Sequence, residues 1–510
     1  MSAIHFKKKC TTLFISILVL GAVKLLLDAS RNLHQQIGHT TAYNTIPARR
    51  DDNLAINSIG KQSNQTQYEK TTRTIERYPD GLFRHQQVLK GLVFTESTKM
   101  GSTDNELSAS VTLSVVKSLS DEVIAHVKQI FNDDHNENIY FATIPAMIKQ
   151  GTKVLVVQRI WLGQFEKMKT KYRSEGVSLN NMFNEWHNSW QENYFYSTVL
   201  DENYNQVEAG GILGIPTTTN VKFTYKSDGP MDPRLIQSLD DVYLVFHTWL
   251  VDKNSKNQVG GRIHIWDMHR HLKKKLWPHI PLQRTEINWI PLDINGQLYF
   301  TYSIDPLRVM KCNKKDGDCL FVHEQDGSSS ETFQYSSDHL RGGTPWLEYK
   351  YPYYISIAHN VASTYRPNED FAIYNANLVV LHVEDWRVVY VSQNIEAHPS
   401  WLHSEPVIRN HTIWSPFWYP TGLIMQTGDI LDISCHLNDA SGHILRLRGV
   451  KSILEQVISE DMKYNKMSKG PVVRTVQQYV LEATKALYNY TWTFTGDIVG
   501  KTVEGKDINV

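Results

Sequence analysis

Polar and ionisable side chains recur at the ends of strand-like segments in the middle of this 510-residue chain. These segments are rich in β-branched and aromatic residues, which predicts strands. When several strands of one fold end in such side chains, the side chains gather into a pocket for a small polar ligand. The candidates for this pocket are Arg159, Asp232, Arg234, Tyr302, Ser303, Arg341, Thr344, His359 and Asp439.

The arginines in this set indicate what kind of ligand the pocket would take. A guanidinium group offers two parallel donors that match two phosphate oxygens. Arg159, Arg234 and Arg341 are therefore candidate phosphate ligands, with a structural ion pair as the alternative for each. Gly342 and Gly343 would let the backbone before Thr344 approach a ligand closely, or they form an entry turn.

The elements that must position these residues follow one pattern, which occurs five times. Each example has a proline, a short apolar strand, a tight polar turn and a second strong strand, and IPAMIKQGTKVLVVQRI is the first. The prolines are far enough apart for four-stranded units, which need roughly 40–50 residues each. Such units bury both faces only when they stack, which predicts an all-β five-bladed β-propeller over residues 86–450 with one central funnel. Unrelated hairpins in a β-sandwich are the alternative. The five prolines are Pro145, Pro233, Pro291, Pro345 and Pro420.

Five motifs, taken in order, carry a resemblance to a known family. They are Asp232-Pro233-Arg234, YSIDPLRVMKC (302–312), LRGGTP (340–345), TYRP (364–367) and HLND (436–439). This combination resembles the fungal β-mannosyltransferases, type II membrane enzymes that add β-1,2-linked mannose to cell-wall mannan and related glycans. The same pattern is similar to the five-bladed β-mannoside phosphorylases and hydrolases. The likeness covers about residues 86 to 450.

The resemblance implies an inverting transfer of mannose from GDP-mannose to a mannose-terminated glycan, without a metal or another cofactor. It implies that Asp232 is the catalytic acid/base and that His359, Tyr365 and Arg366 line the donor-phosphate side. Further candidates for binding sugar hydroxyls are Tyr302, Tyr419 and Asp439.

One departure from the family pattern leaves other functions open. Met231 stands where both groups usually have an acidic residue, which removes one carboxylate and puts the donor or acceptor preference in question. A β-mannoside phosphorylase or hydrolase is the alternative enzyme, and a hydrolase needs a second carboxylate, for which Glu405 is the only nearby candidate. A non-catalytic lumenal glycan-binding propeller is the alternative of another class.

Two motifs hold residue types that can bind a metal ion but favour other interpretations. Asp316-Gly-Asp318 matches the Asp-x-Asp of metal-dependent glycosyltransferases, yet it lies between two strands, where Asp-Gly predicts a hairpin turn. Cys312 and Cys319 flank this loop and predict a disulfide in an oxidising compartment, which leaves Cys435 free and buried. The segment IHIWDMHRHL holds His264, Asp267, His269 and His271, and we interpret it as a solvated basic connector between blades.

The N-terminal region and the charge balance indicate the compartment. Residues 1–10 predict a cytoplasmic tail, residues 11–27 a transmembrane signal anchor and residues 28–85 a polar lumenal stem. A cleaved signal peptide is the alternative. Together these features predict a single-pass type II Golgi membrane protein. With 53 basic and 53 acidic residues, the charge gives no reason to expect a nucleic-acid partner. The three N-glycosylation sequons begin at Asn64, Asn410 and Asn489.

The C-terminal residues 451–510 have a different periodicity. Apolar residues recur at helical spacing over 452–464 and 472–487, and Pro471 precedes the second run. We expect two helices that pack on the rim of the strand domain.

Overall fold

The computed structural model describes the central part of the chain. The described residues are 84–93, 106–132, 139–163, 191–216, 229–251, 259–283, 285–304, 306–325, 340–366, 369–402, 413–414, 417–426 and 429–464. They belong to the larger of two compact units, Arg73–Val510. The predicted anchor, the stem before residue 84, the three sequon asparagines, Glu405 and the helix predicted at 472–487 lie outside them. Within the described ranges, no helix is long and apolar enough to cross a membrane.

The fold is mostly β, and the described strands form three sheets, of fourteen, four and five strands. By their antiparallel pairing we divide these strands into five groups, three of which belong to the largest sheet. The first comprises β3 (Ile139–Gln150), β4 (Lys153–Gly163), β5 (Gln191–Leu200) and β6 (Gln206–Ile212). The second comprises β7 (Met231–Ser238), β8 (Asp241–Val251), β9 (Val259–Asp267) and β10 (Leu272–Lys275). The third comprises β12 (Ile290–Ile294), β13 (Gln297–Ile304), β14 (Leu307–Cys312) and β15 (Asp318–Glu324), with β11 (Trp277–Pro278) beside β15. The fourth comprises β16 (Leu347–Lys350), β17 (Tyr353–Arg366), β18 (Glu369–His382) and β19 (Arg387–Asn394), with β20 (Ile413–Trp414) beside β18.

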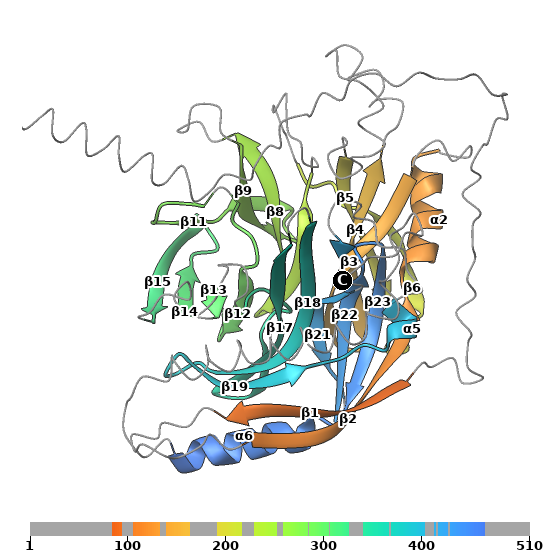
Figure 1. Ribbon diagram of the computed structural model, residues 1–510. Coiled ribbons are helices and arrows are strands. Elements are labelled where there is room, and N and C mark those ends of the chain that lie inside the picture. Colours follow the sequence, from red (N-terminus) through yellow and green to blue (C-terminus); the bar gives the residue numbers. More distant parts are fainter. Residues whose placement is uncertain are drawn as a thin grey trace, which may run out of the picture. The chain divides into compact units, whose positions relative to one another are not determined.

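The fifth group draws its outer strands from the other end of the described chain. Its inner strands are β21 (Trp418–Met425), β22 (Ile430–Leu437) and β23 (Ser441–Arg448). They are completed by β2 (Glu106–Ser118), which pairs with β23, while β1 (Arg84–Val93) pairs with β2 and with β19. The N-terminal strands therefore join the fifth group to the fourth (Figure 1).

The five predicted hairpins are present at the start of the five groups. Four of the prolines lie within the first strand of their group, and Pro345 lies just before β16. Asn295 and Gly296 form the two-residue turn of the third group, with φ of 52° and 82°. This Asn-Gly pair is the residue choice that a type I′ hairpin favours, because both positions need positive φ.

The loop around Asp316 is a hairpin, as expected. It joins β14 to β15, and the Asp316 carboxylate accepts hydrogen bonds from the Asp318 backbone N–H (3.0 Å) and from Asn313 Nδ2 (2.8 Å). Cys312 and Cys319 are joined by a disulfide across this hairpin, and Cys435 is a free, buried thiol.

The predicted helix at 452–464 is confirmed as α6 (Lys451–Tyr464), which packs on β1, β2 and β19 (Figure 1). Its buried face includes Asp461, whose side chain is only 3% exposed. Asp461 accepts two hydrogen bonds from Arg387 (2.5 and 2.6 Å) and one from the Tyr353 hydroxyl (2.8 Å). The other helices are α2 (Ser120–Ile130) and the short α5 (Pro399–Leu402).

Removal of this buried carboxylate should destabilise the domain. Asp461→Ala leaves the partly buried Arg387 guanidinium with only the more distant Asp385 carboxylate (3.4 Å), and we expect a loss of about 3 kcal/mol in the free energy of unfolding, the lower end for a broken buried pair. Glu460→Ala, which removes only the surface pair with Lys463 (2.8 Å), is the control and should cost less than about 1 kcal/mol. Urea denaturation of both variants measures the difference. Equal losses would show that Asp461 does not anchor α6.

Candidate functional site

Asp232 occupies a bulge at the start of the second strand group. The register shifts between Met231 and Arg234, and Asp232 has φ of 54°, in the left-handed region. Aspartate tolerates that region better than most residues. The bulge leaves the Asp232 side chain 39% exposed, while Met231 and Pro233 on either side of it are buried.

The same bulge occurs in the first strand group. Ile144 precedes Pro145 as Asp232 precedes Pro233, with φ of 47°, and the register shifts there between Thr143 and Pro145. A β-branched residue is strained in this conformation, yet the first group adopts it, so the two groups share this backbone shape. The second group differs in placing a carboxylate at this position.

Two cationic or ionisable side chains flank the Asp232 carboxylate. Arg159 Nη1 lies 3.3 Å from Oδ1, and His247 Nδ1 lies 3.3 Å from Oδ2. Arg159 Nε also donates to Asn193 Oδ1 (2.7 Å), which fixes the guanidinium plane. Arg159 pairs with Thr143 and His247 with Met231, so the two occupy equivalent positions in neighbouring strand groups.

The charges around Asp232 favour its ionised form. Burial on its own raises the pKa of this carboxyl. The neighbouring basic side chains oppose that effect, His247 first and then Arg159 and Arg234, and they leave the pKa below its ordinary value. Asp232 is therefore a carboxylate at neutral pH, able to accept a proton.

Arg234 is committed to the backbone of the same region. It is 6% exposed, and it donates from Nε to the Gly343 carbonyl (2.5 Å) and from Nη1 to the Pro233 carbonyl (2.8 Å). Gly343 has φ of 124°, and a Cβ there would lie 2.2 Å from the Ile357 carbonyl oxygen, so only glycine fits. Arg234 thus joins the bulge of β7 to the segment before β16.

Arg341 differs from the other two candidate arginines in its guanidinium group. Its backbone pairs with His359, with N–H···O distances of 2.8 and 3.1 Å. Its Nε is buried and has no hydrogen-bond partner among the described residues. A buried donor of a charged group carries a desolvation cost unless it is satisfied, and an anionic ligand would satisfy it.

An aromatic cluster lies beside these arginines. The Tyr419 ring centroid lies 4.3 Å from that of His359 and 5.1 Å from that of His436, and the Arg234 guanidinium carbon lies 5.8 Å from it. His436 Nδ1 in turn lies 3.3 Å from Asp439 Oδ1. Burial lowers the pKa of His436 to about 4, so it is neutral at physiological pH. Asp232, the three arginines, His359, Tyr419 and Asp439 therefore belong to one connected region.

The other predicted site residues have different surroundings. Tyr302 packs on Trp289 and Phe321 (both 5.6 Å), and its pKa rises to about 12, through burial first and then the adjacent Glu286. The Ser303 hydroxyl donates to the Pro306 carbonyl (2.6 Å). These contacts lie within or next to the third strand group, and among the described residues no hydrogen bond, ion pair or ring contact joins Tyr302 or Ser303 to Asp232. Their predicted sugar contacts stay predictions.

For three more predicted site residues, the structure describes either a buried hydroxyl or the backbone alone. Thr344 is fully buried, and its hydroxyl accepts from the Ile357 backbone N–H (3.0 Å) and lies 3.2 Å from the Ser356 hydroxyl. Tyr365 and Arg366 lie in β17, but their side chains are outside the described set. The ligand-binding roles predicted for these three residues stay predictions.

Sequence reasoning did not select His247, Asn193 or Asn288 for the site. His247-Thr248 ends the second strand of its hairpin as Gln158-Arg159 ends that of the first, and the register opposite Met231 shows that His247 is the counterpart of Arg159. Asn193 lies in β5 and Asn288 lies just before β12, and neither residue belongs to a motif that the sequence shows. The repeated hairpin pattern, aligned residue by residue, is the one signal that could have found His247.

The interpretation of IHIWDMHRHL as a solvated connector is wrong. Its first half is the end of β9, where His264 is 3% exposed and its ring is stacked at 5.6 Å on Phe246. Its second half is the β9–β10 turn. The Asp267 carboxylate accepts there from the backbone N–H groups of His269 (3.0 Å) and Arg270 (2.8 Å). The polar residues of this segment thus belong to two different elements, a buried strand end and a turn whose backbone N–H groups are bonded by Asp267.

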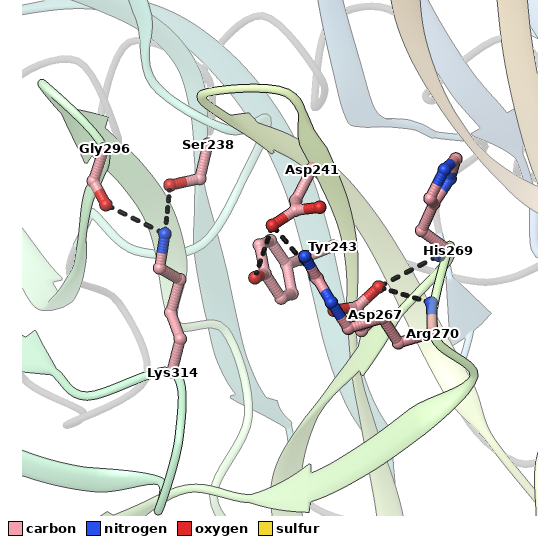
Figure 2. Close-up of polar contacts among 8 residues, drawn as sticks. All are labelled: Ser238, Asp241, Tyr243, Asp267, His269, Arg270, Gly296 and Lys314. Atoms are coloured by element: carbon pink, nitrogen blue, oxygen red, sulfur yellow. Dashed lines mark hydrogen bonds and ion pairs between the residues drawn. The ribbon is translucent and has the colours of Figure 1, made fainter.

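This turn belongs to a charge network at the other end of the β7–β8 hairpin from Asp232, shown in Figure 2. Arg270 Nη1 bridges Asp267 (2.7 Å) and Asp241 (2.9 Å). Nearby, Lys314 Nζ donates to the Ser238 hydroxyl (2.8 Å) and the Gly296 carbonyl (2.9 Å). Both groups of contacts join hairpin turns. Within the described residues, no cluster of three or more His, Cys, Asp or Glu side chains could hold a metal ion.

The chain is similar to curated β-mannosyltransferases, which confirms the predicted resemblance. It is 24% identical over 307 residues to Beta-mannosyltransferase 2 of Komagataella phaffii, a match that covers 53% of this chain and 45% of the relative. The chain thus spans less than half the length of the curated relatives it matches. No protein-family model matches the chain.

Two solved structures are also similar to the chain. A β-1,2-mannobiose phosphorylase from Listeria innocua is 13% identical with a TM-score of 0.38, over 64% of this chain and 94% of that one. A GDP-Man-dependent mannosyltransferase from Leishmania mexicana is 11% identical with a TM-score of 0.34, over 64% and 94%. We therefore describe the fold of this chain from its own strand pairing and not from these two structures.

Proposed function

We propose that this chain is an inverting β-mannosyltransferase that moves mannose from GDP-mannose to a mannose-terminated glycan, with a β-1,2 linkage as the expected product. The observation that carries the proposal is the Asp232 carboxylate, partly exposed and flanked by Arg159 and His247 at 3.3 Å. The similarity to curated β-mannosyltransferases supports the same conclusion.

In this reaction the acceptor hydroxyl oxygen attacks C1 of the mannosyl unit from the face opposite the phosphate. The C1–O bond to the phosphate breaks, GDP leaves with the bonding electrons, and the acceptor proton passes to Asp232. Because the attack is in line with the leaving group, the α-linked donor gives a β-linked product. Arg341, whose buried Nε has no partner among the described residues, is placed to bind the phosphate and stabilise the charge that develops there.

The ionisation state of Asp232 is the one that a transferase requires. A transferase needs a base to take the acceptor proton, and a base must be ionised before it can accept that proton. The neighbours of Asp232 lower its pKa and so keep the carboxyl ionised. The positive charge around Asp232 favours a ligand that carries phosphate, and both a transferase and a phosphorylase bind such a ligand.

The fold we propose for this site is a five-bladed β-propeller. The five groups of antiparallel strands, each with a proline in or just before its first strand, would supply the five blades. The pairing of the N-terminal strand β2 with β23 would close the ring by completing the last blade. The bulge residues and the ends of the second strands would then face the central funnel.

A substrate comparison tests the proposed reaction. The full-length chain, purified in detergent, is incubated with GDP-mannose and mannobiose in the presence of EDTA, and GDP release is measured. In parallel, a β-1,2-mannobioside and inorganic phosphate are supplied, and mannose-1-phosphate is measured. We expect acceptor-dependent GDP release and no phosphorolysis. Phosphorolysis alone would identify a phosphorylase, and glycan binding without turnover would indicate a binding protein.

The pH dependence of transfer should report the Asp232 environment. The rate requires the carboxylate, so it should be lost as the pH falls through the pKa of Asp232. Arg159→Met removes one cation and should raise that pKa, which moves the acidic limb of kcat/KM to higher pH. Arg159→Lys keeps the charge and should move the limb less. An acidic limb that is unchanged in Arg159→Met would show that another group controls it.

A further inference from the structure

Tyr419 lies between the two halves of the proposed site. On one side is Arg234, two residues after Asp232, with its guanidinium carbon 5.8 Å from the Tyr419 ring centroid. On the other side is His359, whose ring centroid is 4.3 Å away and which the family resemblance assigns to the phosphate side. The mannosyl unit being transferred must lie between the base and the phosphate, so Tyr419 is placed beside that sugar ring.

The hydroxyl of Tyr419 is held by a residue from another strand group. It donates to Asn288 Oδ1 at 3.0 Å, and Asn288 lies just before β12, 131 residues earlier in the chain. Since burial raises the pKa of Tyr419, the hydroxyl keeps its proton at physiological pH. With that proton directed to Asn288, the hydroxyl oxygen presents its lone pairs elsewhere, as an acceptor for a sugar hydroxyl.

The local backbone is shaped to bring Asn288 to this position. Asn288 has φ of 67°, a conformation that asparagine tolerates and most residues do not. Gly342 leaves the required space: a Cβ there would lie 2.5 Å from His359 Cε1 and 3.0 Å from Asn288 Oδ1. Asn288, Gly342, His359 and Tyr419 therefore pack as one unit that needs a left-handed asparagine and a glycine.

We propose that Asn288 is a positioning residue that fixes the hydroxyl of Tyr419 and thereby sets the affinity of the site for the mannosyl unit of the donor. The proposal rests on the function proposed above and names a residue that acts through another side chain. It assigns to Tyr419 an acceptor role toward a sugar hydroxyl and to Asn288 the orientation of that acceptor.

A double-mutant cycle tests this proposal. In full-length protein, Asn288→Ala should raise the KM for GDP-mannose about fivefold, the factor that one neutral hydrogen bond contributes. The KM for mannobiose should stay within about twofold. Tyr419→Phe should have an effect similar to that of Asn288→Ala, and the double variant should be no worse than Tyr419→Phe alone. Asn288→Asp keeps an acceptor oxygen and a left-handed backbone, and it should restore most of the affinity.

A matched control separates positioning from loss of stability. Asn295 is an exposed left-handed asparagine in the β12–β13 turn, and Asn295→Ala introduces a similar backbone strain away from Tyr419. We expect both alanine variants to lower the melting temperature, but only Asn288→Ala to change the KM for the donor. Effects of Asn288→Ala and Tyr419→Phe that multiply, or an unchanged KM for the donor, would overturn the proposal. A wild-type chain without transfer would overturn the proposed function, and the role of Asn288 with it.

Discussion

Asp232→Asn should reduce kcat for mannosyl transfer by about a thousandfold or more while the protein remains folded. The carboxylate is the proposed base, and positioned general bases contribute about 10²–10⁴-fold to rates. Asparagine has nearly the same shape and tolerates the φ of 54° at this position, so the bulge should persist. Initial rates of GDP release, with circular dichroism as a check of folding, measure the effect.

The other end of the same hairpin supplies a matched control. Asp241 is also paired with an arginine, Arg270 (2.9 Å), and Asp241→Asn removes a comparable charge away from the proposed site. We expect that variant to keep the wild-type rate. If Asp232→Asn and Asp241→Asn had equal rates, Asp232 would not be the base. Retained mannobiose binding in an inactive Asp232→Asn protein would support a direct role in turnover.

Arg341→Gln should lower kcat/KM for GDP-mannose by about tenfold to a hundredfold. One charge-assisted hydrogen bond is worth about 1.5–3 kcal/mol, and each 1.4 kcal/mol is about a factor of ten. Arg341 is chosen because its Nε lacks a partner among the described residues, whereas Arg234 is bonded to two backbone carbonyls. Steady-state kinetics with each substrate varied in turn measure the effect, and the KM for the acceptor should change little.

The control for this variant is an arginine with its charge already satisfied. Arg270 bridges two aspartates in the network of Figure 2, so Arg270→Gln should leave the KM for the donor unchanged. An Arg341→Gln enzyme with unchanged kinetics for GDP-mannose would mean that the phosphate binds elsewhere, and Arg159 would be the next candidate.

The local features of the fold could be predicted because their signals lie close together in the sequence. Each hairpin combines a proline, a turn and two strands within about twenty residues. The α6 helix follows from apolar spacing alone, and Cys312 and Cys319 are joined as their flanking positions suggested. The pairing of β2 with β23 joins segments at opposite ends of the described chain, and no local pattern indicates such a contact.

The site was only partly predictable for a related reason. Asp232, Arg159 and Arg341 stand out because charged residues are rare beside apolar strands. His247 stands in the polar end of an apolar strand, but its contact with Asp232 depends on which residue faces which across β7 and β8. Asn288 depends on a bond between strand groups far apart in sequence. The prediction for His264 was wrong for a similar reason. Its buried strand end runs directly into a polar turn, and the sequence does not show where the strand ends and the turn begins.

The anomeric configuration of the product tests the central claim most directly. Full-length protein is incubated with GDP-mannose and mannobiose in EDTA, and the new linkage is assigned by NMR from its anomeric C–H coupling. The account predicts a β-linked mannose and, by inversion, a single in-line displacement assisted by Asp232. An α-linked product would contradict it, because that outcome requires retention and therefore a different arrangement of catalytic groups.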